Sequence, residues 1–295
     1  MFLTKKYIKK INKEAFTLIE LSVVILVISV MVVGVLTSKS LIAKSRLANA
    51  KSLTRQSVIN DMGDDLIAWY ETSLEDSFKP SEIKTDASVI TLWKDSNKNA
   101  VNKNDATAVV SPTLVQNVFY NSIPGVRFTG SQYLTFNGTK FAKNSYTVFV
   151  VEQRSTGESG YYNSFISSNI RAGGKRLSLG YYGSNQILQS HFSNDLQTTV
   201  TNYKPQTPSI HTFLFNNTIG KQYTLNGKNP TTPNNQFDPL NSFESATIGY
   251  HQGPTQTYYY KGDLAEIIMF KRSLKTEEVE AIESYLGSKY GIPVS

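Results

Sequence analysis

The hydrophobic pattern of the chain begins with an almost uninterrupted apolar run over residues 16–36. Four positions within it are clearly polar, namely Thr17, Glu20, Ser22 and Ser29. A helix of about 20 apolar residues, rising 1.5 Å per residue, matches the thickness of the hydrocarbon core of a bilayer. It also satisfies all its backbone hydrogen bonds internally, as lipid requires. The run therefore predicts a transmembrane helix over 16–36.

The charges around this run indicate its orientation. Five lysines precede it, at positions 5, 6, 9, 10 and 13. Because flanking positive charge stays on the cytoplasmic side, we expect a cytoplasmic N-terminus and the rest of the chain outside the cytoplasm. An ordinary secretory signal is the competing interpretation, and it requires a short apolar core followed by a small-x-small cleavage site. Here the run is long, ends at Ser38-Lys39-Ser40 and lacks an A-x-A pattern.

The helical pattern continues beyond the apolar run. Residues 37–62 contain neither proline nor glycine, and apolar positions recur there at intervals of three to four residues. This is typical of an amphipathic helix, and Gly63 is a plausible stop signal. We therefore expect one N-terminal helix over 16–62, with a separate domain over 64–295.

From residue 64 onward, short runs of β-formers alternate with turn residues. The expected strands cover 66–70, 89–94, 125–128, 133–136, 146–153, 163–167, 176–182, 187–192, 209–216, 221–225, 246–250 and 263–270. This spacing predicts an all-β antiparallel sandwich or jelly roll. The segment 273–290 breaks the pattern with an apolar stripe at Val279, Ile282 and Leu286, which predicts a short C-terminal helix.

The stretch Lys13-Glu14-Ala15-Phe16-Thr17-Leu18-Ile19-Glu20 resembles the prepilin signal of type IV pilins and type II secretion pseudopilins. The resemblance implies a leader over 1–15, cleavage between Ala15 and Phe16 by a prepilin peptidase, and N-methylation of Phe16. It also implies that Glu20 pairs with the new amine of a neighbouring subunit and sets the register of assembly. Ala15 departs from the glycine that is usual before the cut. A carboxylate stabilised at a helix N-terminus is the alternative interpretation of Glu20.

The domain over 64–293 resembles the concanavalin A-like lectin/glucanase superfamily in its laminin G-like branch. The resemblance rests on LIAWY at 66–70, LWKDS at 92–96, NDAT at 104–107, PGVRFTG at 124–130, YTVF at 146–149 and GDLAEII at 262–268. It implies a jelly roll but leaves function open, because the superfamily contains glycan binders, hydrolases and adhesive domains.

Glycoside hydrolysis needs two carboxylates that flank the scissile bond. The E-x-D-x-x-E strand pattern of the superfamily's hydrolases is missing from this sequence. Asp263 and Glu266 have odd spacing, so in a regular strand they would point to opposite faces of the sheet. We therefore expect no enzymatic activity.

Two further groups of residues are candidate binding sites. Asp95, Asn97 and Asp105 lie in a loop that begins like a calcium-binding loop, although Ala100 and Ala106 replace the glycine and glutamate of an EF-hand. An Asx-turn loop is the alternative, and we expect no other cofactor. Tyr258, Tyr259 and Tyr260 are candidates for stacking on sugar rings, against the alternative of an edge strand with a half-buried face.

The net charge of +7 arises mainly from the leader, because five lysines and one glutamate within residues 1–15 supply +4 of it. The remainder gives little reason to expect nucleic-acid binding. There is no cysteine, so the domain depends on its core rather than on disulfides.

Together these patterns predict a minor pilin or pseudopilin that displays a laminin G-like head for adhesion or for carbohydrate or protein binding. Its expected partners are the prepilin peptidase, other pilin subunits, the inner membrane and a glycan or cell-surface ligand. We expect the head in the periplasm before assembly and on the pilus or cell surface afterwards. The alternatives are an uncleaved, membrane-anchored lectin-like protein and, less favoured, a glycoside hydrolase.

Overall fold

The computed structural model describes residues 17–155, 161–168, 170–191, 195–201 and 204–294. The predicted cleavage and methylation residues, Ala15 and Phe16, lie outside these ranges. The chain divides into two compact units, Met1–Lys44 and Ser45–Ser295. Each unit is described separately below.

Helix α1 (Leu18–Arg55) begins in the first unit, and its last residues belong to the second. All side chains from residue 17 to residue 33 are exposed. Within the described part of the chain, α1 is the helix that is long and apolar enough to cross a membrane by length and composition. This agrees with the apolar run predicted from the sequence.

The α-helix ends at Arg55, seven residues before the predicted end at Met62. The side-chain amide of Asn60 donates to the carbonyl oxygens of Thr54, Arg55 and Ser57 at 3.0–3.2 Å and so satisfies carbonyls at the helix end. The Ser57 hydroxyl then caps a 3₁₀ segment, η1 (Val58–Asp65). Further 3₁₀ turns are η2 (Glu75–Ser77) and η3 (Thr139–Phe141).

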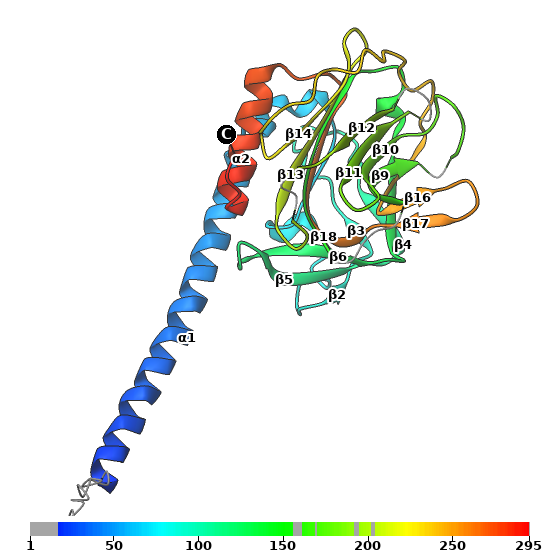
Figure 1. Cartoon of the computed structure of the whole chain (residues 1–295). Coiled ribbons are helices and arrows are strands. Elements are labelled where there is room, and N and C mark those ends of the chain that lie inside the picture. The colour runs from blue at the N-terminus through cyan, green and yellow to red at the C-terminus, as the bar shows by residue number, and fades with distance from the viewer. Residues whose placement is uncertain (1–16, 156–160, 169, 192–194, 202–203, 295) are drawn as a thin grey trace, which may run out of the picture. The chain divides into compact units, whose positions relative to one another are not determined.

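The second unit is an antiparallel β-sandwich (Figure 1). The first sheet has the order β14 (Gly220–Leu225), β13 (Ser209–Asn216), β8 (Tyr146–Arg154), β18 (Lys261–Phe270), β6 (Ile123–Thr129), β5 (Thr113–Phe119) and β2 (Ser88–Val89), and β1 (Leu66–Glu71) also pairs with β18. The second sheet has the order β12 (Leu196–Thr199), β11 (Gln186–Ser190), β10 (Ser178–Tyr182), β9 (Tyr162–Ser168), β15 (Ser245–Ile248), β7 (Tyr133–Asn137), β4 (Ala106–Val110) and β3 (Leu92–Trp93). A separate hairpin joins β16 (Tyr250–Gln252) to β17 (Thr257–Tyr259).

The alternation of side chains along β8 explains why the unit has two cores. Val148 and Val150 point into the core between the sheets, whereas Phe149 and Val151 point to the opposite side. The second core lies between the outer face of the first sheet and the helix α2 (Thr276–Tyr290), which contributes Ile282 and Leu286. Both tryptophans are buried, as their apolar strands predict.

Several short strands were not predicted. The expected strand 89–94 is two strands in different sheets, β2 and β3, and the expected strand 246–250 divides into β15 and β16. The division falls at Gly249, whose φ of 83° is a left-handed conformation that suits glycine. The strands β4, β5, β12 and β17 are additional to the prediction.

Candidate functional site

Thr17 and Glu20 close the N-terminus of α1 by a reciprocal cap. The Thr17 amide and hydroxyl donate to Glu20 Oε2 at 2.8 and 2.9 Å, and the Glu20 amide donates to Thr17 Oγ1 at 3.2 Å. This is a capping box, and it places the carboxylate near the positive end of the helix dipole. Both residues are exposed, so the predicted assembly residue is held in place and remains accessible.

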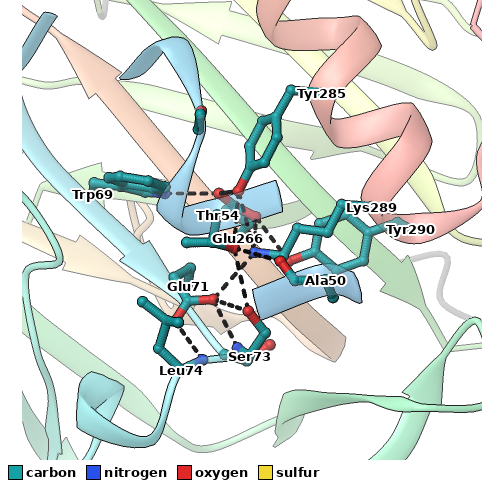
Figure 2. Close-up of polar contacts among 12 residues, drawn as sticks. Ala50, Thr54, Trp69, Glu71, Ser73, Leu74, Glu266, Tyr285, Lys289 and Tyr290 are labelled. Carbon is teal, nitrogen blue, oxygen red and sulfur yellow. Dashed lines mark hydrogen bonds and ion pairs between the residues drawn. The ribbon is translucent and has the colours of Figure 1, made fainter. Parts of the chain in front are cut away.

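A buried charged cluster joins the other end of α1 to the sandwich. We call Glu71, Glu266, Tyr285, Lys289 and Tyr290 the buried joint (Figure 2). The Lys289 ammonium lies 2.8 Å from Glu266 Oε2 and 3.1 Å from Glu71 Oε2. The Tyr285 and Tyr290 hydroxyls donate to Glu266 at 2.9 and 2.8 Å.

The joint connects four elements of the second unit. Glu71 is on β1, Glu266 is the residue opposite it on β18, and the lysine and both tyrosines are on α2. Thr54 Oγ1, in the last turn of α1, lies 3.3 Å from the Tyr285 hydroxyl. Because these side chains are shielded from solvent, the joint positions helices and has no access for a substrate.

Every carboxylate oxygen of the joint accepts hydrogen bonds from nearby donors. Burial raises the pKa of Glu71, but the Lys289 ammonium and hydrogen bonds from Ser73, Ser77 and Leu74 outweigh burial and hold it below its usual value. Burial and the Glu266 carboxylate raise the pKa of the Tyr285 hydroxyl well above its usual value, so it remains a donor. Two carboxylates share one ammonium here, which makes Lys289 the critical member.

The expectation that Asp263 and Glu266 face opposite sides of the sheet is wrong. The pairing of β18 with β8 has a bulge between Leu264 and Glu266, which adds one residue and reverses the alternation. Glu266 then contacts the outer core, and Asp263 forms a two-pronged ion pair with Arg127 at 2.7 and 2.9 Å. Both carboxylates therefore have structural partners.

A second polar network lies inside the inter-sheet core. Glu152 accepts hydrogen bonds from the hydroxyls of Tyr181 and Tyr260 at 2.7 and 2.6 Å, and its Oε1 is 3.0 Å from His211 Nε2. His211 Nδ1 lies 2.9 Å from the Tyr223 hydroxyl. This network corrects the prediction for Tyr260, whose ring is fully buried and presents no surface to a sugar.

Tyr258 and Tyr259 are half-buried and belong to two separate aromatic groups. Tyr258 packs edge-to-face on Tyr162 at 5.3 Å between ring centroids, whereas Tyr259 lies 5.5 Å from Tyr250. Tyr162 in turn stacks on the buried His251 at 3.8 Å. The structure therefore agrees with the alternative of a half-buried strand, with only part of each ring accessible.

The predicted calcium residues are engaged in an Asx-rich loop. The backbone amides of Trp69 and Asn97 donate to Asp95 Oδ1 at 2.9 and 3.0 Å, and the Asp95 amide donates to Asp105 Oδ1 at 2.8 Å. The Lys103 ammonium donates to the carbonyl of Asn97. Within the described residues no group of three or more His, Cys, Asp or Glu side chains could hold a metal ion. The observed contacts agree with the alternative of an Asx-turn loop, and calcium binding that also uses Asn97 stays a prediction.

A groove of about 320 Å³ lies between the two edge strands β12 and β14. Hydroxyl and amide side chains dominate its lining, namely Thr198, Thr199, Thr201, Asn226, Asn229 and Thr231. Among the described residues, Lys228 is the charged member of the lining and no carboxylate belongs to it. Tyr223 forms part of the wall and directs its hydroxyl toward His211. Such a surface can hydrogen-bond a polyhydroxylated ligand but offers no acid pair.

The sequence analysis did not identify Glu71 and Lys289 of the joint or the groove. For Lys289 there was a usable signal, since it follows Tyr285 by one helical turn on a helix whose buried face includes Ile282 and Leu286. The groove had no such signal, because it is formed by residues distant in sequence that lie on edge strands of two different sheets.

A scan against protein-family models and a search of curated proteins gave no match. Similar folds occur among solved structures. A mutant of Trypanosoma rangeli sialidase displaying trans-sialidase activity aligns with a TM-score of 0.53 at 10% identity, over 77% of this chain and 34% of that one. The Trypanosoma rangeli sialidase in complex with sialic acid gives 0.53 at 11%, over 76% and 33%.

A structure described as a receptor binding domain aligns with a TM-score of 0.51 at 13% identity, over 77% of this chain and 52% of that one. The chain thus spans about a third to a half of the length of these structures. At such identities the similarity concerns the fold, which is an antiparallel β-sandwich.

Proposed function

We propose that this chain is a type IV pilin-like subunit, either a minor pilin or a pseudopilin, which displays a β-sandwich head. The observation that carries the proposal is the first half of α1, where every described side chain from residue 17 to residue 33 is exposed although the segment is almost wholly apolar. Such a surface is unfavourable in water and calls for lipid or the helices of other subunits.

The features around this segment support the proposal. Glu20 lies at its start, is accessible and is the last residue of the stretch that resembles a prepilin signal. The antiparallel sandwich supports a concanavalin A-like, laminin G-like jelly roll as the head. In this proposal a prepilin peptidase cuts before Phe16, the chain waits in the inner membrane with its head in the periplasm, and α1 then packs against other subunits in a filament.

The decisive experiment is the intact mass and N-terminal sequence of the protein purified from its native membrane. A chain that starts with N-methyl-Phe16 is the expected result. A chain that starts at Met1 would overturn the proposal and leave a permanently anchored protein.

The groove between β12 and β14 favours a second candidate function, an anchored lectin-like protein that binds saccharides. Its lining of hydroxyl and amide groups suits hydroxylated ligands, and two proteins of similar fold are described as a sialidase in complex with sialic acid and a receptor binding domain. A hydrolase is disfavoured, because two carboxylates are needed at the bond.

Glycan-array binding of the full chain in detergent tests this candidate. The change Thr198→Val, combined with Lys228→Ala, should weaken binding about thirtyfold, since each of the two lost hydrogen bonds contributes roughly 1 kcal/mol. Thr257→Val, at an exposed position outside the groove, is the matched control. Binding that is unchanged in the double variant would exclude the groove as the saccharide site.

A further inference from the structure

The part of α1 that follows the apolar run carries only positive charge. Residues 38–55 contain five lysines and arginines and no acidic residue. Lys51 and Arg55 form ion pairs with Glu75, and Arg46 lies over the Tyr120 ring at 4.1 Å. Lys39 and Lys44 are exposed, and no ion pair within the described residues engages either of them.

The second unit contains a groove of the opposite charge. This acidic groove has a volume of about 190 Å³ and lies between α2 and the outer faces of β13 and β14. Leu214, Leu274 and Val279 contribute apolar surface, and Glu280 and Glu283 contribute carboxylates. It is separate from the groove between β12 and β14 and from the buried joint.

Glu283 is the most unusual member of this groove. Its side chain is 5% exposed, and its hydrogen bond comes from the neutral hydroxyl of Thr212 at 2.6 Å. Burial raises its pKa, and no cation in the described residues pairs with it. A nearly buried carboxylate without a cation is unfavourable, and an incoming ammonium would stabilise its charged form.

We infer that the acidic groove receives Lys39 and Lys44 of α1 from a second copy of this chain. The lysine stems can cover Leu214 and Val279 while their ammonium groups reach Glu280 and Glu283. Charge complementarity within one sequence identifies the occupant, because the exposed cations of α1 and the unpaired acids of α2 recur in every copy.

The contact joins two different surfaces, so it is heterologous and propagates into an open assembly rather than closing into a dimer. Opposite charges at such a contact fix its register more than they add to its affinity. The inference rests on the proposed filament function and specifies which surfaces of the subunit meet.

Disulfide trapping tests the contact directly, because the chain has no native cysteine. Lys44→Cys and Glu280→Cys are introduced together into the full-length protein, which is then oxidised mildly in its native membrane. We expect a ladder of linked chains on a non-reducing gel. A mixture of two chains that carry one cysteine each should yield a linked dimer only.

The matched control combines Lys44→Cys with Glu244→Cys, an exposed acid outside the groove, and should give no ladder. Charge reversal provides the second measurement. Glu280→Lys or Lys44→Glu alone, in a chain without the cysteines, should lower filament incorporation about fivefold, as for a single ion pair, and the two combined should restore it.

The outcomes separate the inference from the proposed function. Processed filaments without Lys44–Glu280 linkage would overturn the inference alone. Linkage in a chain that still starts at Met1 would retain the contact and overturn the pilin function. A chain with neither linkage nor filaments would overturn both.

Discussion

Lys289 bridges two carboxylates that would otherwise lie close together without solvent or a cation. Its ammonium contacts both Glu71 and Glu266, and all three side chains are fully buried. Removal of one partner from a buried ion pair leaves an uncompensated charge, which is more harmful than loss of the pair as a whole.

The change Lys289→Met should therefore destabilise the protein by about 3–5 kcal/mol, a magnitude typical of a broken buried pair. Urea unfolding of the detergent-solubilised full chain, followed by tryptophan fluorescence, measures this free energy. Lys271→Met alters an exposed lysine and should change stability by less than about 0.5 kcal/mol. Equal stability of the two variants would contradict the role of the joint.

Acid should lower the free energy of unfolding, because it protonates carboxyl groups whose pKa values are lowered in the folded protein. Hydrogen bonds and the charge of Arg272 lower the pKa of Glu278 to about 2, and the pKa of Glu71 is also lowered. When folding lowers the pKa of a glutamate, its charged form stabilises the folded protein at any pH above the pKa in the unfolded chain, roughly 4.3. This stabilisation is lost as the pH falls through the lower pKa of the folded protein.

Stability should thus decline from about pH 4.5 down toward pH 2. The Glu278→Gln variant should show a shallower decline over this window, because one linked proton is removed. Thermal unfolding across the pH series measures the slope, and identical slopes for the variant and the parent protein would refute this assignment.

At the level of elements, the N-terminal cap of α1 and the proposed assembly role of Glu20 can be distinguished. Glutamine serves in a capping box as glutamate does, but it carries no charge. Thr17→Ala removes hydrogen bonds of the cap and keeps the carboxylate.

If Glu20 pairs with an amine of another subunit, Glu20→Gln should reduce filament incorporation strongly, whereas Thr17→Ala should have a small effect. Both variants should insert into the membrane normally. Quantitative blotting of sheared filaments and membranes measures both quantities. The reverse order of effects would show that Glu20 acts as a helix cap and not as a partner.

Helices and strands with a clear hydrophobic periodicity could be predicted from the sequence. Features that depend on particular side-chain hydrogen bonds or on strand bulges could not. The apolar half of α1, the amphipathic α2 and the long strands β8 and β18 follow from their patterns. The α-helix α1 ends where the side-chain amide of Asn60 donates hydrogen bonds to three backbone carbonyls. In β18, a bulge determines which side chains point to which face of the sheet. The strand β4 has the mostly apolar sequence ATAVV but largely exposed side chains, so its residues show no alternation of apolar and polar positions.

The same limit applies to the site residues. The position of Glu20 at the start of the helix is local and could be predicted, whereas Tyr260 is buried among core residues distant in sequence and bonds to Glu152, 108 residues away. The acidity of the groove beside α2 depends on which sheet face the helix covers. These contacts depend on how the strands pair and how the sheets pack in the folded protein, which the local sequence pattern does not specify.

For the whole molecule, the second unit includes the last turns of α1. Ala50 is buried in the outer core, and Thr54 contacts Ser73 and Tyr285. A chain that begins at residue 45 should fold as the head does in the full protein.

A chain that begins at residue 57 lacks these contacts and should be less stable by about 2–4 kcal/mol, from a lost buried side chain and hydrogen bonds. Thermal unfolding monitored by circular dichroism compares the two chains. Equal midpoints would mean that the end of α1 contributes nothing to the head.

The position of β1 has a mechanical consequence. β1 follows α1 through one short 3₁₀ segment and pairs with β18, the strand that also leads into α2. Tension applied along α1 would therefore load the pairing of β1 with the central strand β18, with the Glu71–Lys289–Glu266 cluster as a clamp beside it. A head attached in this way would bear a pulling force through two buried strands and the buried ion pairs beside them.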